Sequence, residues 1–374
     1  MSLIQNLPSH CGILICGHGS RAKIAEEEFS LLAKGLRERF PSAKVEYGFL
    51  EYSSPNIHMA LDKLIAQGVT HIYAVPGMLF AATHAKNDIP SVLTTYQKKH
   101  PQLTIEYGQE LGLQDNMINA FQTRILESLG LNETPSTGDL YDTMLVVVGR
   151  GTSVVEANAE ATKLTRIVCE NLGFGWSETV YSGVTYPSVG RGLDMAAKLG
   201  FKKIVVAPYF LFGGKLIDRI YAYVDTVAEQ IPDINFIKAD YLRDQAFVID
   251  TFISRIEEII DNDKQAHGQL NLMQDFKDRL ERGEIDVHHH HAEFKEDDSS
   301  AHSHSHEHSH SHDNDHSHGH SHAPYKHIAH PHGPRTMIND NVCCCFMGQF
   351  PASVIEEEKR VKVEKAGTPS CKKN

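Results

Sequence analysis

The chain has 374 residues, 41% of them hydrophobic, and a formal net charge of −12. This length accommodates two ordinary domains with buried cores, and the acidic balance argues against general nucleic-acid binding, because no net basic surface displaces counterions from phosphates. The sequence contains no apolar run of about 18 residues, so no membrane span is predicted.

The first hundred residues alternate short apolar runs with longer amphipathic ones. Residues 12–16 form a run too short for a helix, which indicates a buried strand. A helical pattern follows over 25–40, then a strand over 45–51, a helix over 56–67 and a strand over 71–79. Strands and helices that alternate at this spacing predict a parallel β-sheet flanked by helices.

This pattern returns 132 residues later. The matching segments are 13–21 with 144–153, 48–55 with 180–188, and 70–82 with 202–214. A constant offset predicts an α/β protein with two duplicated lobes, each a parallel sheet flanked by helices. The expected divisions are a first lobe at 1–136, a second lobe at 137–268, a polar helical linker at 269–287, a low-complexity His-rich segment at 288–322 and a Cys-containing tail at 323–374.

The N-terminal sequence has no basic segment followed by a long apolar one, so no secretory signal is predicted. The seven cysteines do not form a spaced disulfide framework, because three of them are consecutive. A cytoplasmic location is therefore expected.

Three ionisable residues of the first lobe follow successive predicted strands. His18, Glu51 and His84 are separated by 33 and 33 residues, one per strand–helix unit. The carboxyl ends of parallel strands meet at one edge of a sheet, so these side chains are expected to converge there. Two imidazoles and a carboxylate can bind a divalent metal ion or accept protons, whereas any one of them alone would be more typical of a solvated turn.

The second repeat lacks all three groups. Its equivalent positions are Arg150, Gly183 and Leu216. A joint loss, with the surrounding glycines and prolines retained, favours a shared task for the three residues of the first lobe.

Three cations lie near these positions. Arg21, Lys23 and Lys86 are candidates for binding substrate carboxylates, and ordinary surface cations are the alternative. The GHGSR turn at 17–21 lacks the spacing of the usual phosphate-binding loops, so neither a nucleotide site nor ATP is predicted.

Of the 24 histidines, 17 lie between His288 and His332. Dense neutral imidazoles bind transition metals, so this tract predicts metal storage or delivery, with a solubilising linker as the alternative. The candidate storage residues are His302, His304, His306, His308, His310, His312, His316, His318, His320 and His322. Further along, Cys343 and Cys345 are candidate ligands for an iron–sulfur cluster or a soft metal, with free thiols as the alternative.

At GHGSR, GFLE and LFAATHAKNDIP the sequence resembles the CbiX-type sirohydrochlorin chelatases, which are class II, ATP-independent enzymes. The resemblance implies two chelatase-like lobes facing a cleft that binds a tetrapyrrole. It also implies that His18 and His84 hold the metal and help to deprotonate the ring, with assistance from Glu51. Arg21, Lys23 and Lys86 would meet the carboxylates of the substrate.

The implied reaction is insertion of Co²⁺, as a substrate, into sirohydrochlorin with release of two protons, on a route to cobalamin. The His-rich segment is similar to that of long-form cobaltochelatases, but the chain has CCCFMGQF where such forms carry an MxCxxC cluster motif. Two alternatives stay open. One is a ferrochelatase or nickelochelatase acting on the same ring, and the other is a His-rich storage protein or metallochaperone without catalysis.

Overall fold

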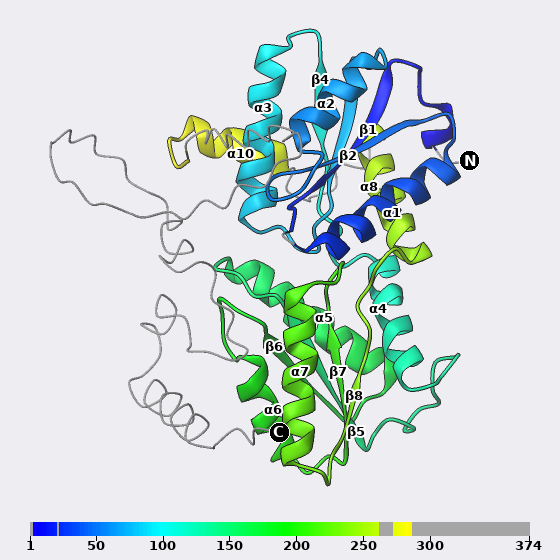
Figure 1. Cartoon of the computed structure of the whole chain (residues 1–374), viewed down its shortest axis with the longest axis vertical. Coiled ribbons are helices and arrows are strands. Elements are labelled where there is room, and N and C mark those ends of the chain that lie inside the picture. Colours follow the sequence, from blue (N-terminus) through cyan, green and yellow to red (C-terminus); the bar gives the residue numbers. More distant parts are fainter. Residues whose placement is uncertain (1–2, 21, 262–271, 286–374) are drawn as a thin grey trace, which may run out of the picture.

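The computed structural model describes residues 3–20, 22–261 and 272–285. It contains two four-stranded sheets whose strands are all parallel, in the orders β2-β1-β3-β4 and β6-β5-β7-β8 (Figure 1). Helices flank each sheet, so the predicted α/β fold with two duplicated parallel-sheet lobes is confirmed.

The first lobe follows the predicted alternation. Its elements are η1 (Leu3–Asn6), β1 (Cys11–Gly17), α1 (Lys23–Arg39), β2 (Lys44–Phe49), α2 (Ile57–Ala66), β3 (His71–Pro76), η2 (His84–Asp88), α3 (Ile89–Lys99), β4 (Thr104–Tyr107) and α4 (Asp115–Ser128).

The second repeat has the same order of strands and α-helices. They are β5 (Thr143–Gly149), α5 (Val155–Leu172), β6 (Trp176–Tyr181), α6 (Val189–Ala197), β7 (Lys203–Pro208), α7 (Lys215–Gln230), β8 (Asn235–Lys238) and α8 (Ala246–Ile260), followed by α10 (Leu272–Glu281). None of the helices in these described ranges has the length and apolar character needed to cross a bilayer.

Burial on both faces explains the apolar sequences of the central strands β1 and β5. Every residue of β1 and of β5 is buried, as expected for middle strands of a parallel sheet covered on both faces, which need apolar side chains on either side. The strand register repeats as well: Gly17 pairs with Phe49 in one sheet and Gly149 with Tyr181 in the other, again 132 residues apart.

Two strands end earlier than the sequence predicts. β3 ends at Pro76 and not at residue 79, because its neighbour β1 ends at Gly17; the Gly77 N–H donates to the carbonyl of Cys16 where this pairing stops. β2 ends at Phe49 and not at residue 51, because the paired strand β1 ends at Gly17, whose carbonyl accepts from the amide of Leu50, and the amide of Glu51 bonds to the carbonyl of His18 in the turn after β1. Residues 50–51 and 77–79 therefore belong to loops at the carboxyl edge of the sheet.

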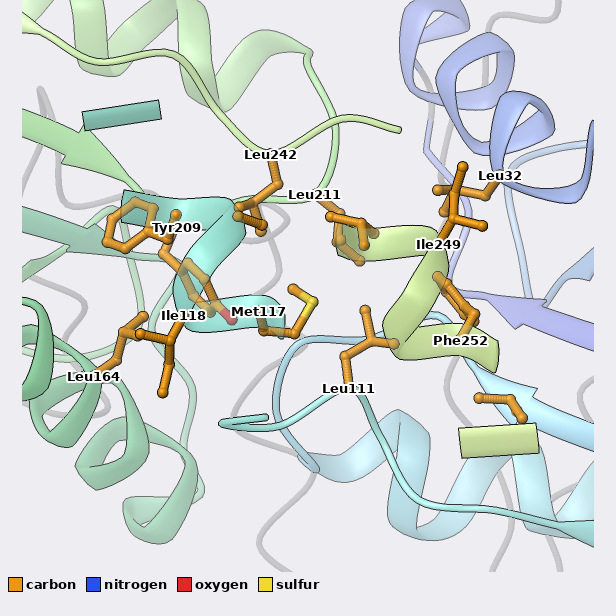
Figure 2. Packing of buried hydrophobic residues seen from close by; sticks show 14 of the residues in the cluster. Leu32, Leu111, Met117, Ile118, Leu164, Tyr209, Leu211, Leu242, Ile249 and Phe252 are labelled. Atoms are coloured by element: carbon orange, nitrogen blue, oxygen red, sulfur yellow. The ribbon is translucent and has the colours of Figure 1, made fainter. Parts of the chain in front are cut away.

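The terminal helix of each repeat packs against the other lobe, which the repeat alone does not predict. α4 contacts β7 and α5 of the second lobe, whereas α8 returns to contact β3, α1 and η1 of the first. One buried apolar cluster consequently joins the two lobes, with Leu32, Leu164 and Phe252 among its members (Figure 2).

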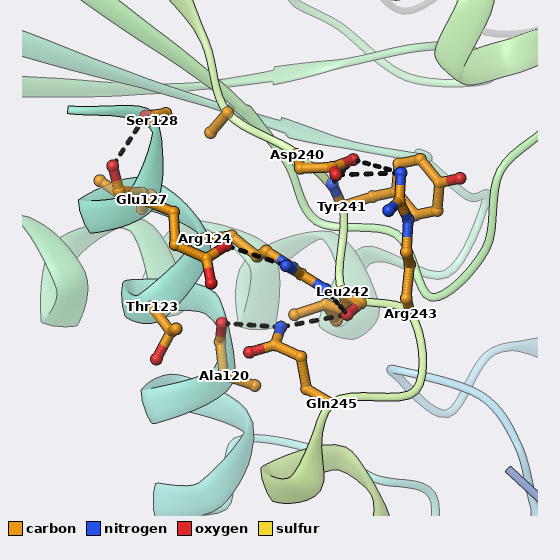
Figure 3. Close-up of polar contacts among 12 residues, drawn as sticks. Ala120, Thr123, Arg124, Glu127, Ser128, Asp240, Tyr241, Leu242, Arg243 and Gln245 are labelled. Carbon is orange, nitrogen blue, oxygen red and sulfur yellow. Dashed lines mark hydrogen bonds and ion pairs between the residues drawn. The ribbon is translucent and has the colours of Figure 1, made fainter. Parts of the chain in front are cut away.

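Polar contacts reinforce this exchange of helices. Arg124 of α4 donates to the carbonyl of Leu242, which follows β8, at 3.0 Å. Gln245 donates to the carbonyl of Ala120 on α4 at 3.2 Å and to that of Leu242 at 3.0 Å (Figure 3). The segment that leads into α8 is therefore fixed to α4 on its way back to the first lobe.

Candidate metal centre

The turn after β1 and the turn after β2 interlock through their backbones. Leu50 donates its N–H to the carbonyl of Gly17 at 2.8 Å, and Glu51 donates to that of His18 at 3.0 Å. Gly19 has a φ of +95°, and a Cβ there would lie 1.6 Å from the Glu51 carbonyl oxygen, so only glycine fits. This close approach places the side chains of His18 and Glu51 next to each other.

The third residue arrives from η2, which follows β3. His84 Nε2 lies 2.9 Å from His18 Nε2, and Glu51 Oε1 lies 3.5 Å from the same His18 atom. One ligand atom from each of these three side chains lies within 4.8 Å of the other two. The structure thus brings together the three residues that the sequence placed at the carboxyl edge.

Both imidazoles are held in the same tautomer. His18 Nδ1 donates to the carbonyl of Gly19 at 3.0 Å, and His84 Nδ1 donates to the Asp88 carboxylate at 2.6 Å. These acceptors fix the hydrogen of each neutral ring on Nδ1, so both Nε2 atoms present lone pairs toward each other. Two facing lone pairs repel unless a cation lies between them. The donor set therefore fits a divalent metal ion.

Asp88 is a member of the site that the sequence analysis did not predict. It is buried, lies four residues after His84 on η2, and orients the ring from behind. In the sequence, Asp88 could have been found as a carboxylate four residues after His84. This spacing brings the two side chains together only if residues 84–88 are expected to be helical.

Burial is the largest cause that lowers the pKa of His18, to about 3, followed by the charges of His84 and Arg150. His18 is therefore neutral at pH 7 and presents a lone pair to a metal ion. A base this weak is poorly suited to removing a proton at neutral pH.

The low pKa of His18 predicts a pH-dependent stability. Between about pH 6.5 and 3 the unfolded chain binds a proton at His18 that the folded chain does not, so the free energy of unfolding falls as the pH drops through this window. One proton contributes at most about 1.4 kcal/mol per pH unit. Urea unfolding in a metal chelator at pH 4.5, 5.5 and 6.5 is expected to show a shallower slope for His18→Gln than for the wild type. Equal slopes would contradict the shift.

The second lobe faces the site with different chemistry. Arg150 follows β5 as His18 follows β1, its side chain is exposed, and its charge acts on both His18 and Glu51. Leu216, the counterpart of His84, lines a cavity of about 180 Å³ together with Ser20 and Ala22 of the first lobe. Residues that follow β1 in the first lobe and β7 in the second therefore line one cavity between the lobes.

The predicted cations lie in different settings. Lys23 is exposed and forms an ion pair of 3.6 Å with Glu27 one helical turn away. Lys86 lies on η2, two residues after His84, and its charge acts on Glu110, which follows β4. Arg21 lies outside the described residues.

The remaining predicted groups also lie outside the described residues. These are Cys343 and Cys345 and the ten candidate storage histidines between His302 and His322.

An aromatic ring borders the site. Tyr52 follows Glu51, is 46% exposed, and stacks at 6.3 Å between ring centroids on His18. Its backbone has a φ of +65°, a conformation that non-glycine residues adopt at a cost. Val184 has the equivalent conformation in the second repeat, so the turn geometry was kept in both lobes.

Comparisons with known proteins agree with this arrangement. The sirohydrochlorin cobaltochelatase of Priestia megaterium is 34% identical over 229 residues, which cover 61% of this chain and 73% of that protein. The sirohydrochlorin ferrochelatase of the same organism is 29% identical over 230 residues, which cover 62% of this chain and 83% of that protein. The structure of SirB from Bacillus subtilis with Fe³⁺ matches with a TM-score of 0.59 at 25% identity, covering 68% of this chain and 98% of that one.

A protein-family model described as CbiX matches the chain twice, at residues 12–128 and 144–259. These two ranges coincide with the two repeats and together span more than half of the chain. The chain therefore belongs to the CbiX family.

Proposed function

We propose that this protein is a sirohydrochlorin cobaltochelatase, which inserts Co²⁺ into sirohydrochlorin without ATP and releases two protons. The observation that carries the proposal is the pair of Nε2 atoms of His18 and His84, 2.9 Å apart with both Nδ1 atoms engaged elsewhere. Relatives named as chelatases of this tetrapyrrole support the choice of substrate. Such a reaction belongs in a cytoplasmic route to cobalamin.

The geometry suggests a division of labour. His18 is suited to binding the metal ion, because its low pKa keeps the lone pair free. His84 is suited to accepting a pyrrole proton, because the Asp88 carboxylate at its Nδ1 stabilises the imidazolium that forms. Glu51 supplies an anionic oxygen that offsets part of the charge of the dication.

The cleft offers partners for the rest of the ring. The substrate carries many carboxylates, for which Arg21, Lys23 and Lys86 remain the proposed partners on the first lobe. Arg150 adds a guanidinium from the second lobe, a group well suited to binding a carboxylate in bidentate fashion. Tyr52 offers an aromatic face at the rim for a planar macrocycle.

The alternative within the same reaction class is insertion of Fe²⁺ or Ni²⁺. Relatives named for cobalt and for iron match this chain at similar identity, and two imidazoles with one carboxylate bind Co²⁺, Fe²⁺ and Ni²⁺ alike. Cobalt is proposed because the relative with the higher identity of the two carries that name.

The test is an insertion assay. The purified full chain is mixed with sirohydrochlorin and with Co²⁺, Fe²⁺ or Ni²⁺ at equal free concentration, without ATP, and the absorption spectrum and proton release are followed. The expected result is insertion, fastest with Co²⁺, with two protons released per ion. Faster insertion of Fe²⁺ or Ni²⁺ would favour the alternative, and no insertion above the enzyme-free rate would overturn the proposal.

A second alternative is a storage protein or metallochaperone that acts through the His-rich tract alone. Deletion of residues 288–322 separates the two functions. Because the proposed site lies in the first lobe, the deletion variant is expected to retain kcat within about two-fold at saturating Co²⁺, while its stoichiometry of bound metal in equilibrium dialysis falls. Loss of all insertion by a folded deletion variant would favour storage or delivery as the function.

A further inference from the structure

The helix α10 lies beyond the second of the two ranges that match the CbiX family model. It nevertheless packs on the first lobe, against η2, α3 and β4 (Figure 1). Its side chains Leu272 and Phe276 are buried, the latter completely. An element outside the two ranges that match the family model therefore packs against η2, the segment that carries His84 and Asp88.

The contact centres on one arginine. Arg279 donates from Nη1 to Asn87 Oδ1 at 2.7 Å and from Nη2 to the carbonyl of Lys86 at 2.9 Å. Its Nε donates to Asp275, one helical turn earlier on α10, at 2.8 Å. All three nitrogens of the guanidinium are thus engaged, and two of them hold consecutive residues between His84 and Asp88.

The sequence of η2 explains why its backbone needs this donor. Pro90 has no N–H, so it can donate neither to the carbonyl of Lys86, four residues before it, nor to that of Ala85, five residues before it. The turn is also wider than an α-helix, since the amide of Ile89 bonds to the carbonyl of His84, five residues earlier. Tyr107 donates its hydroxyl to the neighbouring carbonyl of Ala85 at 3.0 Å. Two side chains from outside therefore donate to the two carbonyls that Pro90 cannot serve.

From these contacts we infer that Arg279 is a positioning residue for His84, and that α10 fixes η2 in the conformation in which His84 faces His18. The inference rests on the proposed function, because its consequence is measured as metal insertion. Arg279 acts through η2: its guanidinium bonds to Lys86, Asn87 and Asp275, and the site residues His84 and Asp88 lie on either side of the two η2 positions.

The test uses the full chain with Arg279→Ala and Arg279→Lys. Lysine keeps the charge but lacks the planar fork that reaches both acceptors. Arg282→Ala is the matched control, because Arg282 lies three residues later and bonds to Glu284. Two quantities are measured: kcat and KM for insertion, and amide hydrogen exchange of the peptide that spans η2, compared with peptides from the second lobe.

Both Arg279 variants are expected to lower kcat about 10-fold with little change in KM, and to speed exchange in the η2 peptide alone. Faster exchange throughout the protein, or unchanged exchange in η2, overturns the inference. Faster exchange in η2 without a change in kcat also overturns the inference. In each of these cases the proposed function stands as long as the wild-type protein inserts metal. If the wild type inserts no metal, the proposed function fails, and the exchange measurement still decides whether α10 holds η2.

Discussion

Replacement of His84 by alanine is expected to lower kcat for metal insertion by about 10³-fold, in the middle of the range for loss of a general base. The variant loses the His84 Nε2 atom, a metal ligand that lies 2.9 Å from His18 Nε2. It also loses the imidazole that would accept a proton with support from the Asp88 carboxylate. The fold should be unaffected, because the side chain lies half-buried at the cleft and outside the apolar clusters. Spectrophotometric insertion under saturating metal measures the effect, and circular dichroism checks the fold.

The first lobe supplies a matched control for this variant. His71 lies at the amino end of β3, whereas His84 follows its carboxyl end, and His71 also forms a 2.6 Å contact with a carboxylate, that of Glu106. His71→Ala therefore removes an equivalent imidazole–carboxylate pair away from the site and is expected to leave kcat within about two-fold. A folded His84→Ala variant with normal turnover would remove His84 from the mechanism.

Replacement of Asp88 by asparagine is expected to lower kcat by roughly 10- to 100-fold, the usual effect of losing a partner that orients a metal-binding histidine. Asparagine occupies nearly the same volume in this buried position. It lacks the negative charge that stabilises an imidazolium, and its amide can donate to Nδ1 and so favour the wrong tautomer of His84. The reduction should appear in kcat, with KM for the tetrapyrrole little changed.

Glu106→Gln is the control for this second variant. It makes the same chemical change in the His71 pair and is expected to have no effect on insertion. If Asp88→Asn and Glu106→Gln reduce kcat equally, the loss would reflect the stability of the lobe and not the orientation of His84. Thermal unfolding of both variants separates these two causes.

The alternation of strands and helices was predictable because burial imposes its period locally. β1 and β5 are buried on both faces and appear in the sequence as short continuous apolar runs. Strand ends were less predictable. β2 and β3 stop at Phe49 and Pro76 because β1, the strand that both pair with, ends at Gly17, and the length of a partner strand is not visible in a local pattern.

The candidate site was also predictable only in part. His18, Glu51 and His84 were predictable because each follows a strand of one parallel sheet, and such strands end at a common edge. The repeat showed Arg150 only as the residue that stands where the first lobe has His18. Its position beside the site depends on how the two lobes face each other.

By itself, the sequence determined the duplicated α/β lobes and the three groups that meet at one sheet edge, because strand periodicity and the constant offset of 132 residues are properties of the chain alone. Only the tertiary structure decided the exchange of α4 and α8 between lobes, the tautomers set by Gly19 and Asp88, and the contact of Arg279 with η2. The physical reason is that these features are pairings between distant segments, and a hydrogen bond has no sequence signature until the fold brings its donor and acceptor within reach.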